Sequence, residues 1–198
     1  MHDSHEVAWP PAFEKKVEVF YHRTLGWQLH VADIVSNGGK PLSDQNDAPE
    51  FSPVPHSGFA VLQICLSYFE TVAQYSSNPA GKNSGQLFKE GVCSVFPNLA
   101  KGNEADVKEL LKILWQEGRN GLYHVSMTRV KVGLGQPGNN IAMAFSPSQK
   151  QLVIDPHLLP KALKNHLKRY CDALLDSRNV VLRRDFEAMF DKENGIRN

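Results

Sequence analysis

The chain has 198 residues, of which 41% are hydrophobic and 22% are charged. This length suits one domain that buries roughly 70% of its unfolded surface, and this composition excludes a wholly disordered or fibrous chain. The net charge is only +1, but residues 1–100 carry a net −4 and residues 101–198 a net +5. We therefore expect residues 1–198 to form one folded domain with a basic C-terminal half.

Signals for export or membrane insertion are missing from the sequence. No apolar run approaches the roughly 18–20 residues of a transmembrane helix. The N-terminal residues lack a basic segment followed by an apolar core, so no secretory signal is indicated. Cys65, Cys93 and Cys171 lie far apart and fit no zinc spacing, and we interpret them as reduced core thiols. A cytoplasmic protein with no membrane contact is expected.

Apolar residues at helical spacing predict a first helix that begins near Phe13. Gly38 and Gly39 supply its end, because glycine readily takes the left-handed conformation that closes a helix. Residues 39–56 are rich in Pro, Asp, Ser and Asn, and their four prolines prevent a continuous element. This segment is predicted to be a long surface loop.

The next helix is predicted to begin at Ser57, which can cap it, and to extend over about residues 57–77. Its apolar residues cover much of its circumference and Glu70 is its only charge, which is typical of a buried helix. A shorter helix follows over residues 86–99 and should end near Pro97, because proline cannot continue a helix.

Residues 103–127 are predicted to form an amphipathic helix capped by Asn103. The pattern then changes to short alternating segments, which predict a β-hairpin or a three-stranded insertion around residues 127–154. Helical periodicity returns from Pro156 to Asp176, and a last helix is predicted from Val180 to Phe190. The predicted fold class is therefore mainly α, with a small β insertion.

A formal GxGxxG pattern is present at Gly133, Gly135 and Gly138. A dinucleotide-binding fold would need a helix after the third glycine, but strand-like residues follow it, so we interpret the pattern as a hairpin turn. The sequence holds no zinc-protease, P-loop or α/β-hydrolase motif and no cluster of metal ligands. No cofactor and no metal are predicted.

Basic residues concentrate between Arg119 and Tyr170, where eight cations face a single acid, Asp155, for a net charge of +7. Such a tract attracts a polyanion, although a solvated face turned toward the acidic half remains equally open. Six of these cations are the candidate RNA contacts: Arg129, Lys131, Lys161, Lys164, Lys168 and Arg169.

The C-terminal part of the amphipathic helix predicted over residues 103–127 places Arg119, Asn120 and His124 in the order R-N-x-x-x-H. Histidine can exchange a proton near neutral pH, and arginine offers a permanent forked cation for phosphate oxygens. Asn120 can orient either group or the scissile phosphate. This set suits the attack of a ribose 2′-OH on its neighbouring phosphate.

The triplet resembles the R-x(4–6)-H signature of the HEPN superfamily, helical domains named for higher eukaryotes and prokaryotes nucleotide-binding. Many members are metal-independent RNases, and they are up-and-down helical bundles, usually dimers, whose paired motifs line a cleft at the dimer interface. The resemblance covers most of residues 13–176 and implies a HEPN-like bundle. It also implies catalytic roles for Arg119, Asn120 and His124, with Glu70 as a polar partner from an earlier helix.

Two features qualify the resemblance. Some toxin members carry a tyrosine two residues after the histidine that a partner nucleotidyltransferase modifies, but Ser126 stands there in this chain. No nucleotidyltransferase partner is therefore expected. The structural alternatives also stay open: His124 as a helix C-terminal histidine, and Arg119 paired with Glu117 or Glu70.

Helical geometry separates the two main groups of the motif. At about 100° per residue, Arg119 and His124 diverge by roughly 140°, so one straight helix does not aim both at one atom. The reach of the long Arg119 side chain, a distorted turn at Gly118 and Gly121, or a second subunit across a twofold axis would each bring the two groups together. A homodimer is predicted, and its candidate apolar contacts are Trp115, Leu122 and Tyr123.

Together with the residue chemistry, the resemblance implies a metal-independent endoribonuclease. By the same resemblance, we expect it to leave a 2′,3′-cyclic phosphate and to act in defence or stress control, as toxins and phage-defence proteins do. The alternative is a non-catalytic helical module that binds RNA or a protein partner through the basic tract. The RNA substrate and any antitoxin or other regulator are not indicated by the sequence.

Overall fold

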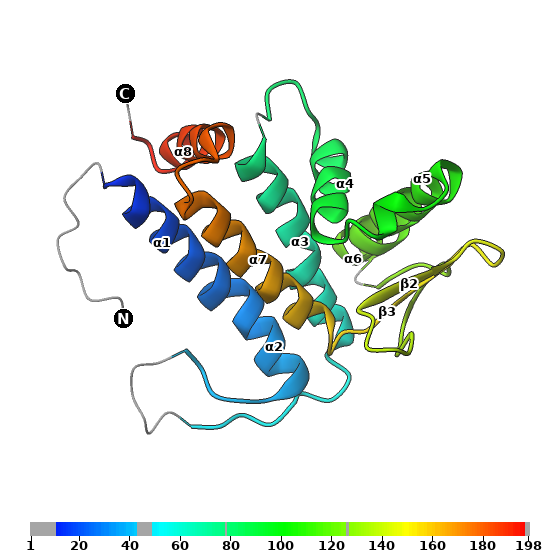
Figure 1. The fold of residues 1–198 in the computed structure, drawn as a ribbon. Helices are drawn as coiled ribbons and strands as arrows, with labels where there is room; N and C mark the ends of the chain where they lie inside the picture. Colours follow the sequence, from blue (N-terminus) through cyan, green and yellow to red (C-terminus); the bar gives the residue numbers. More distant parts are fainter. Residues whose placement is uncertain (1–10, 43–48, 78, 126, 197–198) are drawn as a thin grey trace.

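The computed structural model describes residues 11–42, 49–77, 79–125 and 127–196. Over these ranges the protein is mainly helical and carries one small three-stranded sheet (Figure 1). The α-helices are α1 (Phe13–Thr24), α2 (His30–Asn37), α3 (Gly58–Ser76), α4 (Ser84–Val95), α5 (Glu104–Ile113), α6 (Asn120–Val125), α7 (Leu159–Leu175) and α8 (Val180–Glu193). The strands are β1 (Val132–Leu134), β2 (Met143–Ser146) and β3 (Gln151–Ile154).

Two long helical segments each contain a widened π-helical turn. The turn Leu25–Leu29 joins α1 to α2, and the turn Leu114–Arg119 joins α5 to α6. The first segment ends at Asn37, and Gly38 follows with a positive φ of 73°, as the sequence predicted. A short 3₁₀ turn, Leu99–Lys101, leads into α5.

The helix starts confirm one predicted cap and correct another. Asn103 caps α5, because its side-chain oxygen accepts a hydrogen bond from the Ala105 amide at 2.9 Å. Ser57 occupies the position before α3 without capping it. Its hydroxyl instead donates to the Val35 carbonyl oxygen at 3.3 Å, and so ties the start of α3 to α2.

Helix α3 forms the centre of the core. It packs against α2, α4, α7 and α8, and its Tyr68 and Phe69 side chains are fully buried. Figure 1 shows α1, α7 and α3 side by side, with α8 lying across one end of them. On the side of α3 away from α1, α4 packs along α3, and α5, α6 and the sheet lie on the same side of the molecule (Figure 1). Buried Lys16 joins α1 to α8 by donating hydrogen bonds to Glu187 and Asp191 at 2.7 and 3.0 Å.

The sheet has the strand order β1-β3-β2, with β1 parallel and β2 antiparallel to β3. The prediction of a hairpin turn across Gly133, Gly135 and Gly138 is therefore wrong. The Gly135 amide donates to the Ile154 carbonyl oxygen at 3.0 Å, so the chain continues along β3 instead of turning back beside β1. Residues 135–142 then cross to the far edge of β3, and the hairpin is the one between β2 and β3.

The segment between α2 and α3 begins with a bridge in which Gly39 and Phe51 exchange two backbone hydrogen bonds of 2.8 Å. Residues 49–56 are exposed, in keeping with the predicted surface loop, and residues 43–48 lie outside the described ranges. In the described part of the chain, every helix is too short or too polar to cross a membrane.

Candidate functional site

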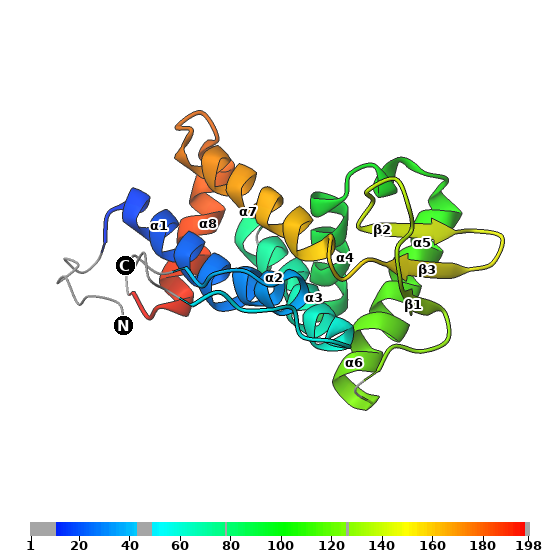
Figure 2. The same cartoon turned by 90° about the horizontal axis from the view of Figure 1, so that it is seen from below.

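The R-N-x-x-x-H motif lies where the second long helical segment ends. Arg119 is the last residue of the π-helical turn, and Asn120 and His124 lie on α6. Figure 2 shows α6 at the edge of the molecule, beyond the ends of α3 and α4. Ser126, which stands where some HEPN toxins carry a tyrosine, lies outside the described residues.

Arg119 is held by contacts from two other helices and from its own face. Its Nε and Nη2 atoms lie 2.9 and 2.8 Å from Oε1 of Glu70 on α3. The guanidinium carbon lies 4.8 Å from the ring centre of Trp115 and 4.4 Å from that of Tyr123. Because Trp115 and Tyr123 stand four residues before and after Arg119, the two rings flank the cation along one helical face.

Glu70 uses both of its carboxylate oxygens. Oε1 accepts from Arg119, and Oε2 accepts from the hydroxyl of Ser84 at the start of α4. The side chains of Arg119 and Glu70 keep only 22% and 16% of their surface exposed. Of the two structural partners that the sequence left open for Arg119, the structure selects Glu70 and not Glu117.

The other two motif residues, Asn120 and His124, point in different directions. Asn120 Oδ1 accepts a long hydrogen bond of 3.4 Å from Nη1 of Arg119. His124 is exposed and forms no hydrogen bond or ion pair with any residue that the structure describes. The structure thus brings Glu70, Arg119 and Asn120 together, while His124 faces solvent on the adjoining face of α6.

Gly121 within the motif leaves room for the chain that follows it. A Cβ atom on Gly121 would lie 2.8 Å from the Met127 carbonyl oxygen, so a larger residue would displace the returning chain. The Arg129 amide then donates to the Glu117 carbonyl oxygen at 3.1 Å, and the Lys131 amide to Glu117 Oε2 at 3.0 Å. The predicted distortion exists as the π-helical turn, but it does not bring Arg119 and His124 into contact.

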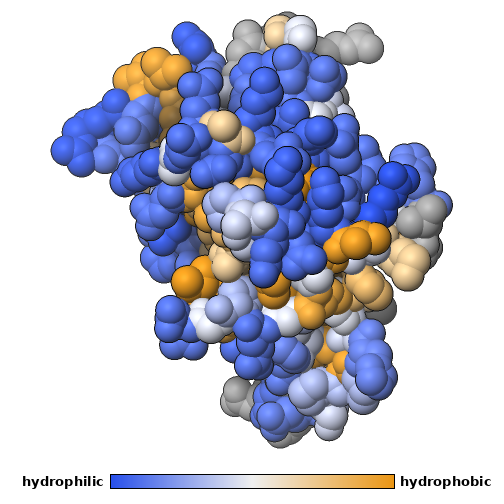
Figure 3. Space-filling view, turned by 90° about the vertical axis from the view of Figure 1, so that its right-hand side faces the viewer, coloured by the Kyte–Doolittle hydropathy of each residue, from blue (hydrophilic) through white to orange (hydrophobic). Residues whose placement is uncertain are grey.

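The candidate RNA contacts lie in two places. Arg129 and Lys131 precede β1, and the other four, Lys161, Lys164, Lys168 and Arg169, lie on α7. Three of the six reach acids outside the basic window. Lys164 binds Asp33, Lys168 lies 2.9 Å from Asp172, and Lys131 lies 3.9 Å from Glu117. On the face that carries α5 and the sheet, hydrophilic residues predominate and apolar residues form separate small groups (Figure 3).

Asp155, the single acid of the basic window, has a structural task. Its side chain is buried, and Oδ1 accepts from the backbone amides of His157 and Leu158 at 2.8 and 3.2 Å. It therefore satisfies free amides just before α7 begins. The carboxylate of Asp155 is therefore not exposed to solvent beside the cations of that window.

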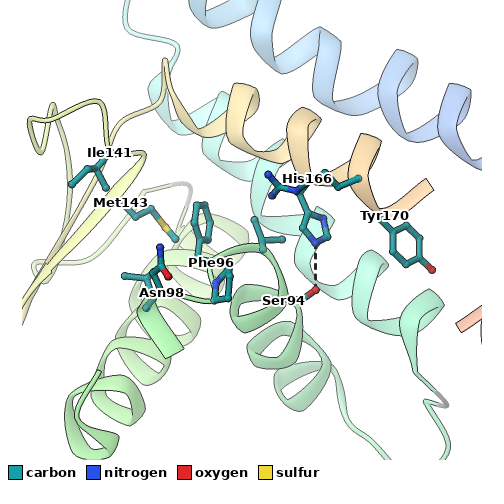
Figure 4. A pocket seen from close by; sticks show the side chains of 11 residues that line it. Ser94, Phe96, Asn98, Ile141, Met143, His166 and Tyr170 are labelled. Carbon is teal, nitrogen blue, oxygen red and sulfur yellow. Dashed lines mark hydrogen bonds between the residues drawn. The ribbon is translucent and has the colours of Figure 1, made fainter. Parts of the chain in front are cut away.

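A second polar group, Tyr68, Ser94 and His166, was not predicted from the sequence. The Tyr68 hydroxyl lies 2.8 Å from Nδ1 of His166, and the Ser94 hydroxyl lies 3.3 Å from Nε2, as Figure 4 shows. Burial, and then the nearby Arg169 cation, lower the pKa of His166 to about 4. The sequence did hold one indication that His166 is buried. It lies three residues after Leu163 and four before Tyr170, on the apolar face of α7.

Metal ligands do not gather in the described part of the chain, where no three His, Cys, Asp or Glu side chains lie close enough to hold an ion. All three cysteines are free, and Cys65 and Cys171 are buried. Burial raises the pKa of the Cys171 thiol to about 12, which keeps it protonated and unreactive.

The comparisons with known proteins identify no relative: no protein-family model, no curated protein and no solved structure matches this chain.

Proposed function

We propose that the chain is a metal-independent endoribonuclease of HEPN type, with Arg119, Asn120 and His124 as its catalytic residues. The observation that supports this proposal best is the fixed position of Arg119. A guanidinium held by Glu70 and flanked by two aromatic rings lies five residues before an exposed histidine on the same helical segment.

The roles follow from the chemistry of each group. His124 exchanges the proton of the attacking 2′-OH or of the leaving 5′-oxygen, which requires access to solvent and to RNA. Arg119 stabilises the charge that develops on the phosphate, and a guanidinium that is already oriented does so without reorganisation. Asn120 orients the phosphate, and Glu70 is a positioning residue for Arg119. The products are a 2′,3′-cyclic phosphate and a 5′-hydroxyl.

The biological role proposed with this activity is defence or stress control, in which cleavage of cellular RNA arrests growth. Three exposed candidate cations form no ion pair with an acid among the described residues, and they would add affinity for the RNA backbone: Arg129, Lys161 and Arg169. The alternative, a module that binds RNA without cutting it, uses the same cations and does not need His124.

The test is cleavage of a labelled RNA with EDTA present throughout, by the wild type, His124→Ala and His22→Ala. His22 is a matched control because it is an exposed histidine on α1. We expect His124→Ala to lower the cleavage rate by about 10²–10⁴-fold, the usual contribution of a general acid or base, while His22→Ala cleaves like the wild type.

RNA affinity separates the proposal from the alternative. Fluorescence anisotropy should show that His124→Ala binds RNA with nearly unchanged affinity, because the histidine is one neutral or singly charged group among many contacts. Cleavage that persists in His124→Ala, or that needs added Mg²⁺, would refute the mechanism. A wild type that binds RNA and never cuts it would favour the binding module.

A further inference from the structure

A cavity of about 660 Å³ lies between α4, the residues that follow it, the sheet and α7 (Figure 4). We name it the α4–α7 pocket. Its volume lies within the roughly 300–1,000 Å³ of pockets that hold small molecules. None of the motif residues Arg119, Asn120 and His124 lines it, so it is distinct from the proposed cleavage site, although its lining residue Arg169 is also a candidate RNA contact.

One side of the pocket is apolar. Val95 and Phe96 come from the end of α4, Leu99 from the 3₁₀ turn, and Ile141 and Met143 from the start of β2 and the residues before it. Ile141 keeps 44% of its surface exposed although it is a large aliphatic residue. An apolar ligand body in the pocket would cover such surface and gain free energy by removing it from water.

The opposite side is polar and uncharged apart from one residue. Buried His166 keeps only 8% of its surface exposed and is held by Tyr68 and Ser94. Since its pKa is lowered to about 4, the imidazole is neutral at physiological pH. The Ser94 hydroxyl completes the neutral hydrogen-bonding groups at this side, whereas the Asn98 amide lies beside Phe96 and Met143 (Figure 4).

Arg169 is the one charged residue of the lining, which includes no Asp or Glu. It is exposed, and its guanidinium forms no hydrogen bond or ion pair with any residue in the described ranges. A guanidinium presents several donors in a plane and binds a carboxylate through two parallel hydrogen bonds. Beside an apolar wall, this donor set selects a ligand with one anionic end.

We propose that the α4–α7 pocket binds a small apolar carboxylate, with its body against Phe96, Ile141 and Met143 and its anionic end on Arg169 and Ser94. Catalysis by Ser94 and His166 as a nucleophile and base is disfavoured. A histidine that acts as a general base becomes protonated when it accepts the proton. Burial and the nearby Arg169 cation make the protonated form of His166 unfavourable.

Two probes of the same shape test the charge requirement: 2-naphthoate and its neutral analogue 2-naphthamide, titrated into the full chain by calorimetry. We expect naphthoate to bind at least tenfold more tightly than naphthamide. Arg169→Gln should remove this preference. Lys168→Gln should retain it, because that variant loses one charge from the same helix at a residue that does not line the pocket.

The site of binding is read from the imidazole resonances of His166, which should shift as naphthoate is added at pH 7. Thermal unfolding of both variants checks that the fold is intact. Equal affinity for the two probes, equal losses in the two variants, or saturation without a shift at His166 would each overturn the proposal.

Discussion

The guanidinium of Arg119 is held in one position because residues from three helical segments surround it. Glu70 supplies the anion from α3, Ser84 holds that anion from α4, and Trp115 and Tyr123 flank the cation on its own segment. A flexible arginine would lose side-chain entropy on binding phosphate, whereas this one has already lost it on folding. The position of Arg119 therefore depends on Glu70.

Replacement of Glu70 tests this dependence. Glu70→Gln keeps the shape of the side chain and removes its charge, which leaves a partly buried guanidinium without its anion. We expect the free energy of unfolding to fall by about 1–3 kcal/mol, measured by urea denaturation, and RNA cleavage to fall at least about tenfold. Glu90→Gln breaks the exposed pair with Lys82 and should cost less than about 1 kcal/mol. Equal effects of the two substitutions would contradict the positioning role.

His166 gives the stability of the protein a pH dependence of known sign. Its folded-state pKa of about 4 lies below the ordinary value of 6.5. The unfolded state therefore takes up more protons as the pH falls from about 7 toward 4, and stability is lost in that window. A shift of this size costs about 2 kcal/mol by pH 5.

Urea denaturation at pH 7.5 and pH 5.0 measures this loss. The wild type should lose about 2 kcal/mol more than His166→Gln between the two pH values, because glutamine cannot titrate and all other groups are shared. The same loss in both proteins would show that His166 does not remain neutral in the folded state.

Residue-scale contacts were the hardest to predict from the sequence. The motif itself was visible, because Arg119, Asn120 and His124 lie within six residues. The choice of Glu70 over Glu117 was not, because it depends on how α3 packs beside the motif, 49 residues away. For the same reason the contact of Tyr68 with His166, across 98 residues, left no local signal.

At the scale of elements, local signals set the helices and long-range pairing set the sheet. Gly38 ends a helix and Asn103 caps one through local backbone contacts, so both helix ends could be predicted from the sequence. The π-helical turns carry no such signature, since their residues also suit an ordinary helix. The partner of β1 depends on a crossover, and a turn-like glycine segment therefore gave a wrong hairpin.

The contact of α3 with α4 depends on one glycine. A Cβ atom on Gly91 would lie 1.9 Å from the carbonyl oxygen of Phe69, so the two helix backbones touch there. Gly91→Ala must separate the helices, and we expect thermal and urea denaturation to show a loss of about 3 kcal/mol or more.

Gly26→Ala is the matched control for this substitution. Gly26 also lies inside a long helical segment, but its Cβ would meet only Leu42, at 4.0 Å. Its stability should stay unchanged or rise by up to about 1 kcal/mol, because alanine favours a helix more than glycine does. If Gly91→Ala is as stable as Gly26→Ala, the close approach of α3 and α4 is wrong.

At the scale of the whole molecule, one copy of the chain leaves the proposed site divided. Arg119 turns toward Glu70, while His124 faces solvent on the next face of α6. The apolar residues near the motif fall into two groups, one buried in the core and one exposed. Leu122 keeps only 2% of its surface exposed and belongs to the core, so its prediction as a dimer contact is wrong, whereas Tyr123, Met127 and Val130 keep 47%, 53% and 93% exposed.

We predict that the active form is a homodimer in which His124 of one subunit acts with Arg119 of the other. A twofold contact through α6 would bring both copies of the motif together and cover the exposed apolar residues beside it. Light scattering at micromolar concentration should give twice the chain mass.

Mixing two inactive variants tests whether the site is shared between subunits. Arg119→Ala and His124→Ala should each be inactive, but after subunit exchange an equal mixture should regain up to about a quarter of wild-type cleavage. Half of the dimers would then be mixed, and each would hold one intact pair of catalytic residues. A monomer that cleaves RNA, or a mixture as inactive as its components, would mean that each chain completes its own site.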